Sequence, residues 1–506
     1  MNRKSLVGLL FCVMFLASFA VGLVQVRSIE FPDGYATIHD VDKAFDGLNI
    51  FLEKGTNKGA FVVDMEGNLI SSSAIGDGHI DFMNSTTVVI TTGRAGYIWN
   101  MIDNNLVNLS FGSHHDLEYN PFTDTFLILK GVREGSCENP DGITMPIEYD
   151  DILEVDREGN VVWEWDMSEH IPFDLMEHSL RWEVKGKGEN QAHDWSHANA
   201  VFWDIDKNMI YLNTRNLDTF YKIDKLTGDI VWACGRYNGD FTLLDKDGDE
   251  VESLWYHSHG LEKMSENHFI QFDNDIYNSN TVSPWDGNSS LLEIEVDEEN
   301  MVAREVWRWI APIEYFADRF GDANRMPNGN TLGCFGVPPS HLTEVTSEGE
   351  IVWEMLLSDY QVYRVERFLT KPLAEIVPTG SFTQGSPIVL TFNVLDTIKR
   401  SYLTGGVLTI IEDDLVLKEM TFQFSPYWQE TELFVDIGEL PLGRHNLKLT
   451  VENCDGISNS VDFTVYVSYS KTVWSEQVFV TMLSLGAIVG IAFATFAGYH
   501  LTKKYR

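Results

Sequence analysis

The sequence predicts an all-β protein: a six-bladed β-propeller followed by an immunoglobulin-like β-sandwich, with an N-terminal signal or anchor helix and a C-terminal transmembrane helix. Three observations predict this fold class. A hairpin pattern recurs six times, a later region alternates apolar and polar residues, and both ends carry uncharged apolar segments. The 506 residues are 44% hydrophobic and 12% aromatic, so the chain can bury a substantial core.

Residues 1–26 are predicted to be a signal peptide or an uncleaved signal anchor. Arg3 and Lys4 precede an uncharged apolar run that extends from Ser5 to Val26. The small residues around Ala20 offer a cleavage site, but the apolar run continues beyond it. Both possibilities therefore stay open at this end of the chain.

Residues 47–369 are predicted to form the propeller. Each hairpin has an apolar strand, a tight turn of Asp, Asn or Gly, and a second strand that often ends in Trp. Single strands lie between the hairpins, for example at residues 85–93 and 207–215, and these are expected to be the inner strands. The units average about 50 residues, the size of a four-stranded blade. Residues 362–368 are expected to close the ring. The hairpins begin at Phe61, Tyr97, Leu153, Tyr221, Leu292 and Thr343.

Residues 373–468 are predicted to form the immunoglobulin-like sandwich. Short runs of alternating apolar and polar residues, separated by turn residues, are typical of about seven strands. The region contains one cysteine, Cys454, so it lacks the inter-sheet disulfide of antibody domains. Its position before the C-terminal apolar segment favours a stalk that carries no catalytic residue.

Residues 477–499 are predicted to span the membrane, and residues 500–506 to form a basic cytoplasmic tail. Basic residues at both extremes of the chain place those extremes inside the cell, so residues 27–476 are expected to be extracellular. The chain is therefore expected in the cell membrane, with one or two passes. Gly486 and Gly490 could form the seam of a homodimer.

Composition excludes several classes of partner. The 76 acidic residues outnumber 36 basic ones, which disfavours nucleic acid because phosphate binding needs clustered Lys and Arg. No CxxC pair or nucleotide-binding motif occurs, and Glu250 stands where a calcium loop that starts at Asp245 would need glycine. We therefore predict no metal and no cofactor. One or two disulfides remain open among Cys137, Cys234, Cys334 and Cys454.

Five histidines lie in three of four short stretches that stand beside strands expected to line the channel. Together with Arg215, which is expected on an inner strand, they come from three predicted blades and should converge at one end of the central channel. A single buried histidine is more often structural, but recurrence at equivalent places favours a site. The five histidines are His114, His115, His197, His257 and His259.

Three segments of the sequence resemble the arylsulfate sulfotransferase family, whose members move a sulfuryl group between phenols without the nucleotide donor PAPS. These segments are DWSHANAV, TR before YKID, and HSHGL before FDND. The resemblance covers residues 47–369 and implies a six-bladed propeller. It also implies that His259 is the histidine that becomes sulfurylated and that Arg215 binds sulfate. It further implies that His197 and Asn199 are the family's H-x-N pair and that His115, or its neighbour His114, is the histidine of the HHD stretch. His197 and His115 are therefore predicted to be catalytic, and Asn199 and His114 to bind substrate. His257, two residues from His259, is also predicted to bind substrate and remains the rival of His259 as the attacking histidine.

These residue types suit sulfuryl transfer. Its transition state is loose and carries negative charge on the equatorial oxygens, so a charged arginine fork and positioned donors supply most of the catalysis. A neutral His259 would attack sulfur and give ping-pong kinetics with an aryl sulfate donor and a phenolic acceptor. Two alternatives remain: a non-catalytic surface receptor or adhesion protein, and a sulfatase in which water replaces the phenol.

Overall fold

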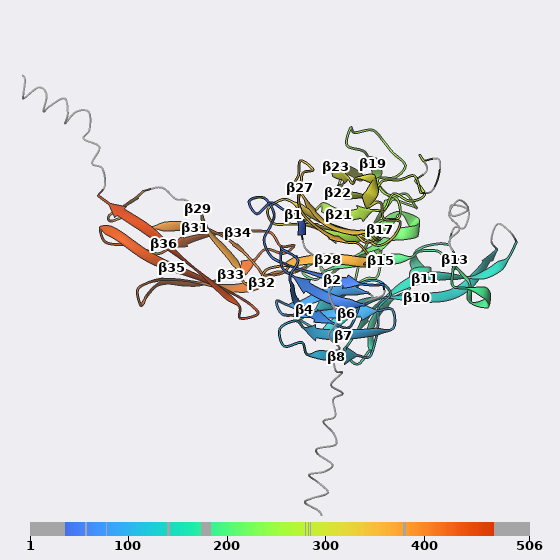
Figure 1. Cartoon of the computed structure of the whole chain (residues 1–506), viewed down its shortest axis with the longest axis horizontal. Helices are drawn as coiled ribbons and strands as arrows, with labels where there is room; N and C mark the ends of the chain where they lie inside the picture. The colour runs from blue at the N-terminus through green and yellow to red at the C-terminus, as the bar shows by residue number, and fades with distance from the viewer. Residues whose placement is uncertain are drawn as a thin grey trace, which may run out of the picture.

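The computed structural model describes residues 36–469, except 56–57, 77, 139–141, 174–183, 279, 282, 284 and 378–380. Nearly all regular structure in this part of the chain is β, so the all-β prediction is confirmed (Figure 1). The predicted signal or anchor segment, the transmembrane segment and the basic tail lie outside the described residues. Within those residues, no helix is both long and apolar enough to cross a membrane.

Residues 36–368, called here the six-sheet unit, form six sheets, each built on four antiparallel strands that are consecutive in the chain in every sheet except the first. The first is β28 (Val362–Phe368), β2 (Leu48–Glu53), β3 (Gly59–Val63) and β4 (Leu69–Ser73). The second is β5 (His79–Asn84), β6 (Thr87–Thr92), β7 (Ala95–Asn100) and β8 (Leu106–Leu109). The third is β9 (Leu117–Asn120), β10 (Thr125–Glu138), β11 (Thr144–Val155) and β12 (Val161–Trp165), with β13 (Val184–Lys185) and β14 (Ala192–Asp194) added.

The fourth sheet is β15 (Ala198–Asp204), β16 (Met209–Thr214), β17 (Thr219–Asp224) and β18 (Ile230–Gly235). The fifth is β20 (His259–Lys263), β21 (His268–Asp273), β22 (Ser290–Asp297) and β23 (Val302–Ile310), with β19 (Thr242–Leu244) added. The sixth is β24 (Asp322–Arg325), β25 (Thr331–Phe335), β26 (Ser340–Val345) and β27 (Ile351–Leu357), with β1 (Ala36–His39) on its outer edge. The helices are single turns: α2 (Met167–His170), η2 (Gly188–Asn190), η3 (Arg215–Leu217) and η4 (Ile313–Tyr315).

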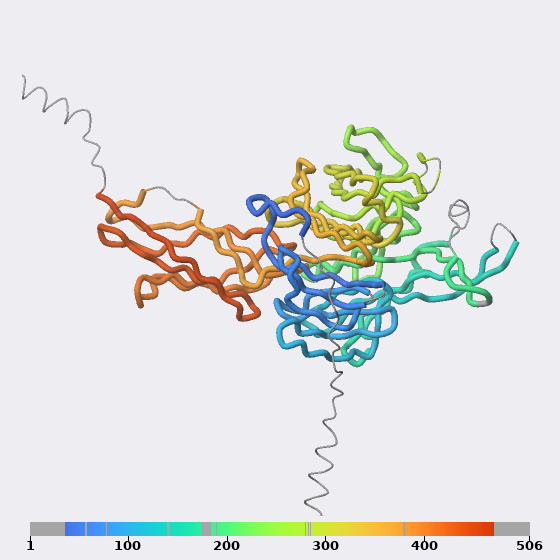
Figure 2. Tube along the Cα trace, viewed as in Figure 1, coloured from blue at the N-terminus to red at the C-terminus, as the bar shows by residue number. Residues whose placement is uncertain are grey.

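The six sheets follow one another in a closed cycle. The first strands contact each other in the order β5, β9, β15, β20, β24 and β28, and β28 pairs with β2, which contacts β5. Residues 362–368 therefore join the two ends of the unit in one sheet, as the sequence pattern predicts. The tube in Figure 2 shows this strand crossing to the blue N-terminal strands.

The strands that face the centre of this cycle differ from the prediction. Residues 85–93 and 207–215 contribute β6 and β16, which are second strands, so the expectation that they are inner strands is wrong. The first strand of the fourth sheet is β15, in which every residue is buried. Because such a run has no polar alternation, its sequence does not distinguish a first strand from the strand that follows. The predicted hairpins form the third and fourth strands.

Tryptophans at the hairpin ends link neighbouring sheets. The indole N–H of Trp165 donates to the Gly228 carbonyl oxygen at 2.9 Å, in the β17–β18 turn of the next sheet. Trp309 donates to Gly349 at 3.2 Å, and Trp353 in the sixth sheet donates to Met65 in the first at 2.7 Å. The repeated bond satisfies a buried donor and fixes one sheet against the next. These bonds support a packing role for the tryptophans.

Residues 373–468, called here the two-sheet unit, form two facing sheets. One contains β29 (Leu373–Val377), β31 (Val389–Leu395) and β34 (Thr431–Asp436). The other contains β30 (Phe382–Thr383), β36 (Ser458–Ser468), β35 (Gly443–Asn453), β32 (Thr404–Glu412) and β33 (Leu415–Phe424). Alternate residues of β35 are buried in a shared apolar cluster. The four described cysteines are all unpaired, which resolves the open question about disulfides among them.

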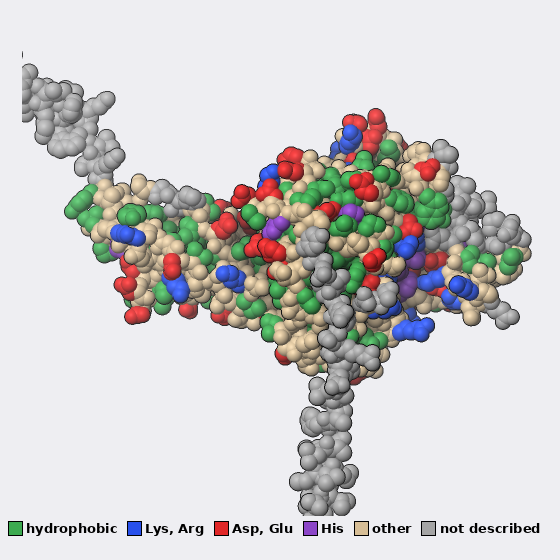
Figure 3. Space-filling model, viewed as in Figure 1, with side chains coloured by type: hydrophobic (Ala, Val, Ile, Leu, Met, Phe, Trp, Pro, Cys, Tyr) green, Lys and Arg blue, Asp and Glu red, His purple; other side chains and the backbone are tan. Residues whose placement is uncertain are grey.

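The two units are packed together. Trp428 of the two-sheet unit is buried in a cluster with residues of the first and sixth sheets, and its ring meets that of Phe45 edge-on at 5.3 Å. Its indole also donates to the Asp396 carbonyl oxygen. Figure 3 shows acidic side chains in scattered groups on the visible face of both units. The predicted role of residues 373–468 as a stalk does not account for this buried contact between the two units.

Candidate functional site

Three predicted histidines lie in tight turns that lead into first strands of successive sheets. His115 precedes β9, His197 precedes β15 and His257 precedes β20, and their φ angles are 75°, 45° and 59°. This left-handed region is unfavourable for most residues, although histidine enters it more often than branched residues do. The repeated turn directs the chain into each strand from the same end, which explains why side chains of several sheets meet there.

His115 and His197 are hydrogen-bonded to each other. Their Nε2 atoms are 3.1 Å apart, so one nitrogen donates and the other accepts. Nδ1 of His197 donates to Asp194 Oδ2 at 2.5 Å. Burial and the nearby charge of His114 and His197 hold the pKa of His115 well below its usual value, so this ring is neutral. One proton therefore lies between Nε2 of His115 and Nε2 of His197, and this hydrogen bond links two sheets.

His259 is buried, and its tautomer is fixed by Asn274. The Asn274 amide N–H groups donate to the carbonyl oxygens of Ala317 and Phe320 at 2.8 and 2.9 Å. Its Oδ1 must therefore accept from Nδ1–H of His259, 2.6 Å away. Burial, followed by the charge of Arg215, holds the pKa of His259 well below its usual value. Nε2 is thus an unprotonated nitrogen with an available lone pair.

Arg215 lies at the start of η3, immediately after β16, and not on an inner strand as predicted. The backbone N–H of Arg215 donates to the His197 carbonyl oxygen at 3.2 Å, which couples the arginine to the histidine turn. Its charge lowers the pKa of both His259 and the Tyr363 phenol, so the guanidinium lies close to both groups. The structure therefore brings Arg215 together with His259, His115 and His197.

Tyr363 on β28 joins the histidines and was not predicted from the sequence. Its hydroxyl lies 2.9 Å from Nδ1 of His115, and its ring meets the His259 ring edge-on at 6.4 Å. Burial raises the pKa of this phenol well above its usual value, so the hydroxyl keeps its proton. The Lys54 ammonium group lies 4.6 Å from the centre of the same ring. The closing strand thus contributes a neutral proton donor and holds a cation nearby.

Asn199 has a structural role in this arrangement. Its amide N–H donates to the Ser258 carbonyl oxygen at 2.8 Å, and its Oδ1 accepts from Asn213 at 2.8 Å. Ser258 immediately precedes His259, so these bonds hold the turn before His259 against β15. Both ends of the amide contact protein groups, which favours a positioning role over the predicted substrate contact.

His114 and His257 lie behind the central histidines. His114 is held between Asp150 Oδ1 at 3.0 Å and Lys185 Nζ at 2.9 Å, and its ring centre is 4.1 Å from that of His115. The fully buried His257 faces Asp218 and Tyr277. It lies in the turn before β20 with a left-handed backbone, so His257 and His259 are not two positions on one face of a strand.

The residue after His259 must be glycine because there is no space for a side chain. Gly260 has φ of 60°, and a Cβ there would lie 2.5 Å from Asp322 Oδ1. Register also shifts between His259 and Glu262 in the pairing of β20 with β21. The strand therefore begins with a bulge that directs His259 toward the centre. Within the described ranges, no group of three or more His, Cys, Asp or Glu is arranged to hold a metal ion.

Asn274, Tyr363 and Asp194 complete the site, and sequence signals for them existed. Asn274 belongs to the FDND segment, at the end of the strand that pairs with the His259 strand. Tyr363 lies on the predicted closing strand, and Asp194 is three residues before His197. None of these positions shows which partner it meets, because Asn274 contacts a residue of the neighbouring strand and Tyr363 contacts a residue of another sheet.

A buried imidazole with an unprotonated Nε2 lies beside an arginine and two further histidines, and this arrangement suits the transfer of a charged group. A family model described as Arylsulfotransferase (ASST) matches residues 24–365, more than half of the chain. The chain therefore belongs to the arylsulfotransferase family and is a sulfotransferase of the PAPS-independent kind. The predicted resemblance is confirmed.

Similarity to solved structures is distant. A candidate 6-phosphogluconolactonase of Bacteroides fragilis is 10% identical, with 65% of this chain and 99% of that chain covered and a TM-score of 0.34. Sqt1 of Saccharomyces cerevisiae is 9% identical, with 70% and 79% covered and a TM-score of 0.30. Hydrazine synthase of Kuenenia stuttgartiensis is 13% identical, with 64% and 77% covered and a TM-score of 0.28. A comparison with curated protein sequences gave no match.

Proposed function

We propose that this enzyme moves a sulfuryl group from an aryl sulfate donor to a phenolic acceptor through a sulfohistidine formed on Nε2 of His259. The observation that carries this proposal is the fixed amide of Asn274. Two carbonyl oxygens hold its N–H groups, so its oxygen keeps the proton of His259 on Nδ1. A neutral imidazole with a free lone pair on Nε2 is the form that can attack sulfur.

The fold proposed for this enzyme is a six-bladed β-propeller over residues 47–369, followed by an immunoglobulin-like sandwich over residues 373–468. The cyclic contacts between six sheets and the mixed first sheet support the propeller. The two facing antiparallel sheets with alternating burial support the sandwich. In such a ring, the turns before the first strands open at one end of the central channel.

In the first displacement, Nε2 of His259 attacks the sulfur of the donor. The N–S bond forms as the aryl O–S bond breaks, and the bonding pair leaves on the phenolate oxygen. Negative charge on the equatorial oxygens is stabilised by the fork of Arg215. The His115–His197 pair enters this step with one positive charge, gives the proton between its Nε2 atoms to the phenolate and becomes neutral, while the Tyr363 hydroxyl holds His115 in place.

In the second displacement, the acceptor phenol gives its proton to the same histidine pair and attacks the sulfohistidine. The new O–S bond forms while the N–S bond breaks, and the pair of electrons returns to Nε2. His259 and the histidine pair are then in their starting states. Since each half-reaction uses the same groups, the donor and the acceptor should occupy overlapping positions and give ping-pong kinetics.

The test uses the full chain, an aryl sulfate that releases a coloured phenol, and a second phenol as acceptor. Donor loss and sulfated acceptor are followed separately. A covalent mass equal to one sulfuryl group, on the peptide of residues 254–275, is expected in wild type and should disappear in His259→Gln. His268→Gln is the matched control, because His268 lies on the same peptide but faces Glu293. An adduct that persists in His259→Gln would overturn the assignment.

The same assay separates the alternatives. Loss of donor without sulfated acceptor would indicate a sulfatase, in which water takes the place of the phenol. A wild type and a His259→Gln variant that are equally inert toward a panel of donors would favour the non-catalytic receptor or adhesion protein. The complete set of Arg215, His259 and the histidine pair favours the transferase, because a binding surface does not require a fixed imidazole tautomer.

We also propose that the bulk of the chain is extracellular and anchored in the cell membrane through residues 1–26, 477–499, or both. The uncharged apolar segments and their basic flanks support this topology. Protease added to intact cells should degrade residues 36–469 but spare an epitope placed after Arg506. A protected body would overturn the topology. Substitution of Gly486 and Gly490 by Leu should weaken the proposed homodimer, if the helices pair through these residues.

A further inference from the structure

The first strands that carry the histidines at one end carry carboxylates a few residues further on. On β20, Glu262 follows His259 by three positions, and on β28, Glu366 follows Tyr363 by three. At about 3.3 Å per residue, three positions correspond to about 10 Å along a strand. These groups face a narrow cavity of about 60 Å³. The six carboxylates that interact there are Asp81, Asp116, Glu118, Glu262, Asp322 and Glu366.

Lys399 of the two-sheet unit reaches into this carboxylate cluster. Its Nζ donates to Glu262 Oε1 at 2.5 Å, to Asn324 Oδ1 at 2.6 Å and to Glu366 Oε2 at 3.3 Å. These acceptors belong to β20, β24 and β28, three neighbouring first strands. All three ammonium hydrogens are therefore used, each on a different sheet. Burial lowers the pKa of Lys399, but Glu262 and Glu366 outweigh burial and raise it overall.

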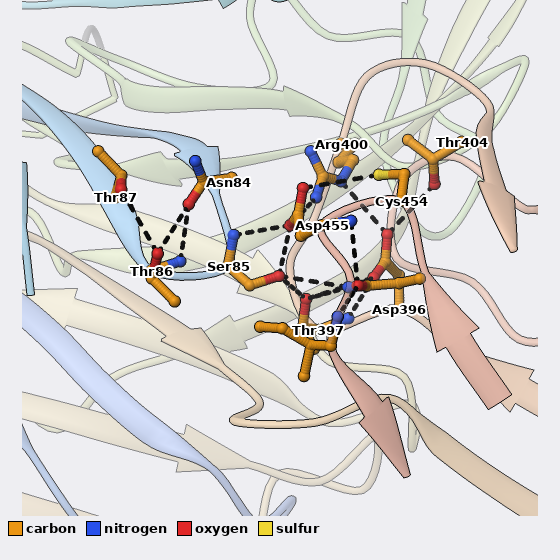
Figure 4. A network of polar contacts seen from close by, with 12 residues as sticks. Asn84, Ser85, Thr86, Thr87, Asp396, Thr397, Arg400, Thr404, Cys454 and Asp455 are labelled. Atoms are coloured by element: carbon orange, nitrogen blue, oxygen red, sulfur yellow. Dashed lines mark hydrogen bonds and ion pairs between the residues drawn. The ribbon is translucent and has the colours of Figure 1, made fainter. Parts of the chain in front are cut away.

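The loop that presents Lys399 is fixed by both units. Arg400, the next residue, pairs with Asp396 at 3.3 Å and with Asp455 at 2.6 Å. Asp455 also accepts from the backbone N–H of Ser85 in the six-sheet unit at 2.8 Å. Figure 4 shows these groups meeting between the β5–β6 turn and the loops of the two-sheet unit. The ammonium group is thus delivered by a preformed loop and not by a freely moving side chain.

A second cation connects this cluster to the histidine site. Arg364, adjacent to Tyr363, donates to Asp116 Oδ2 at 3.2 Å and to the Asn199 carbonyl oxygen at 3.0 Å. Asp116 immediately follows His115, and it also pairs with His79 at 2.8 Å. The position of Arg364 therefore sets the turn that carries His115. Among the described residues, Arg364 and Lys399 are the permanent cations that balance the six carboxylates.

We propose that Lys399 is a positioning residue. The two-sheet unit inserts the Lys399 ammonium group among the carboxylates of the first strands. This group keeps Arg364 on Asp116, and Asp116 in turn holds the turn that carries His115. Without Lys399, Arg364 would be the remaining cation beside the carboxylates, and it would be drawn away from Asp116 toward Asp322 and Glu366. A shift of about 1 Å at His115 would suffice to slow the proton steps.

The test compares Lys399→Met with wild type in the full chain. Because positioning acts on the chemical steps, we expect kcat to fall by about 10- to 100-fold, with KM changed by less than about 2-fold. Hydrogen exchange should rise in the peptides that contain Ser85 and Asp455, and the melting temperature should fall. Lys448→Met removes an exposed lysine of the same unit and should change none of these quantities.

Two further variants keep the test decisive if Lys399→Met folds poorly. Lys399→Arg keeps the charge and should restore most of kcat. Glu262→Gln combined with Lys399→Met removes one unbalanced charge, so the double variant should be more active than Lys399→Met alone. Unchanged kcat and unchanged exchange in Lys399→Met would overturn the proposal. The activity measurements depend on the proposed function, whereas exchange and melting test the insertion of Lys399 even if wild type transfers no sulfuryl group.

Discussion

The two ends of the first strands are both buried and polar, yet they differ in what their partners do. At the histidine end, burial lowers the pKa values of His115 and His259, which are neutral. At the carboxylate end, burial raises the pKa of Asp322 to about 7 and that of Glu366 to about 8. Burial thus favours the neutral form at each end.

The hydrogen-bond partners decide which end carries out chemistry. At the histidine end, a carboxamide with a fixed orientation leaves a nitrogen lone pair exposed to the site. At the carboxylate end, Lys399 occupies the acceptors of three sheets and leaves no comparable group available among the residues it contacts. A shifted pKa at either end shows only that the group is buried. The hydrogen-bond partners show whether a buried group keeps an atom available for chemistry.

The largest effect on activity is expected from Arg215→Lys at the histidine end. Lysine keeps one charge but loses the planar fork that matches the sulfuryl oxygens, so kcat/KM should fall by about 10²- to 10³-fold. Both half-reactions should slow, and the adduct on His259 should still form in a long incubation. Arg157→Lys, on an exposed pair with Asp124, is the control and should behave as wild type. Equal rates in both variants would remove Arg215 from the mechanism.

Asn274→Leu should reduce kcat by about 10²-fold, because His259 would no longer be held in the tautomer with a free Nε2. Asn274→Asp provides a second measurement. Its carboxylate still accepts from Nδ1–H but adds a negative charge, which raises the pKa of His259. The acid limb of the rate of adduct formation should therefore move to higher pH. An acid limb at the wild-type position in Asn274→Asp would contradict the role given to this amide.

Tyr363→Phe should have a smaller effect on activity. The variant loses the hydroxyl that contacts Nδ1 of His115 but keeps the ring beside His259, so kcat should fall by about tenfold with little change in melting temperature. Tyr466→Phe, on an exposed tyrosine of the two-sheet unit, is the matched control. A loss as large as that of Arg215→Lys would show that the phenol takes part directly in proton transfer.

The carboxylate end should appear mainly as a pH dependence of stability. A carboxyl group with a raised pKa holds a proton in the folded chain that the unfolded chain has released, so unfolding becomes more favourable as the pH rises through that pKa. Because the pKa of Glu366 is raised from 4.5 to about 8, the free energy of unfolding should fall from about pH 4.5 to about pH 8 and level off at higher pH.

The slope is limited to about 1.4 kcal/mol per pH unit for each proton released. Glu366→Gln should flatten it, because the amide does not titrate, whereas Glu432→Gln on an exposed strand position should leave it unchanged. Chemical unfolding measured across this pH range provides the comparison. A slope that is the same in wild type and Glu366→Gln would show that Glu366 does not hold the proton.

Part of this arrangement could be predicted from the sequence. The hairpins were recognisable because a strand, a tight turn and a tryptophan recur, and the turns before His115 and His197 lie beside apolar runs that must be strands. The inner position of β15 was missed because each residue of it is buried, which removes the alternation that marks a strand face. Arg215 was misplaced for the same reason, since its strand was taken for the inner one.

The remaining partners depend on contacts between distant parts of the chain. Tyr363 meets His115 only because β28 pairs with β2, and Lys399 meets Glu262 only because the two units pack together. A lysine in a loop of the two-sheet unit carries no local sign of a buried role. The expectation that this region is a passive stalk followed from the absence of clustered histidines, and one side chain is enough to change that interpretation.

The mixed composition of the first sheet has a consequence for synthesis of the protein. Leu48 pairs with Phe368, so the strand that leaves the ribosome early waits for one that emerges much later. Because β28 also supplies Tyr363 and Arg364, an incompletely translated or prematurely released chain lacks the strand that closes the cycle of sheets and part of the site. Catalytic competence is thereby reserved for molecules whose translation has passed β28.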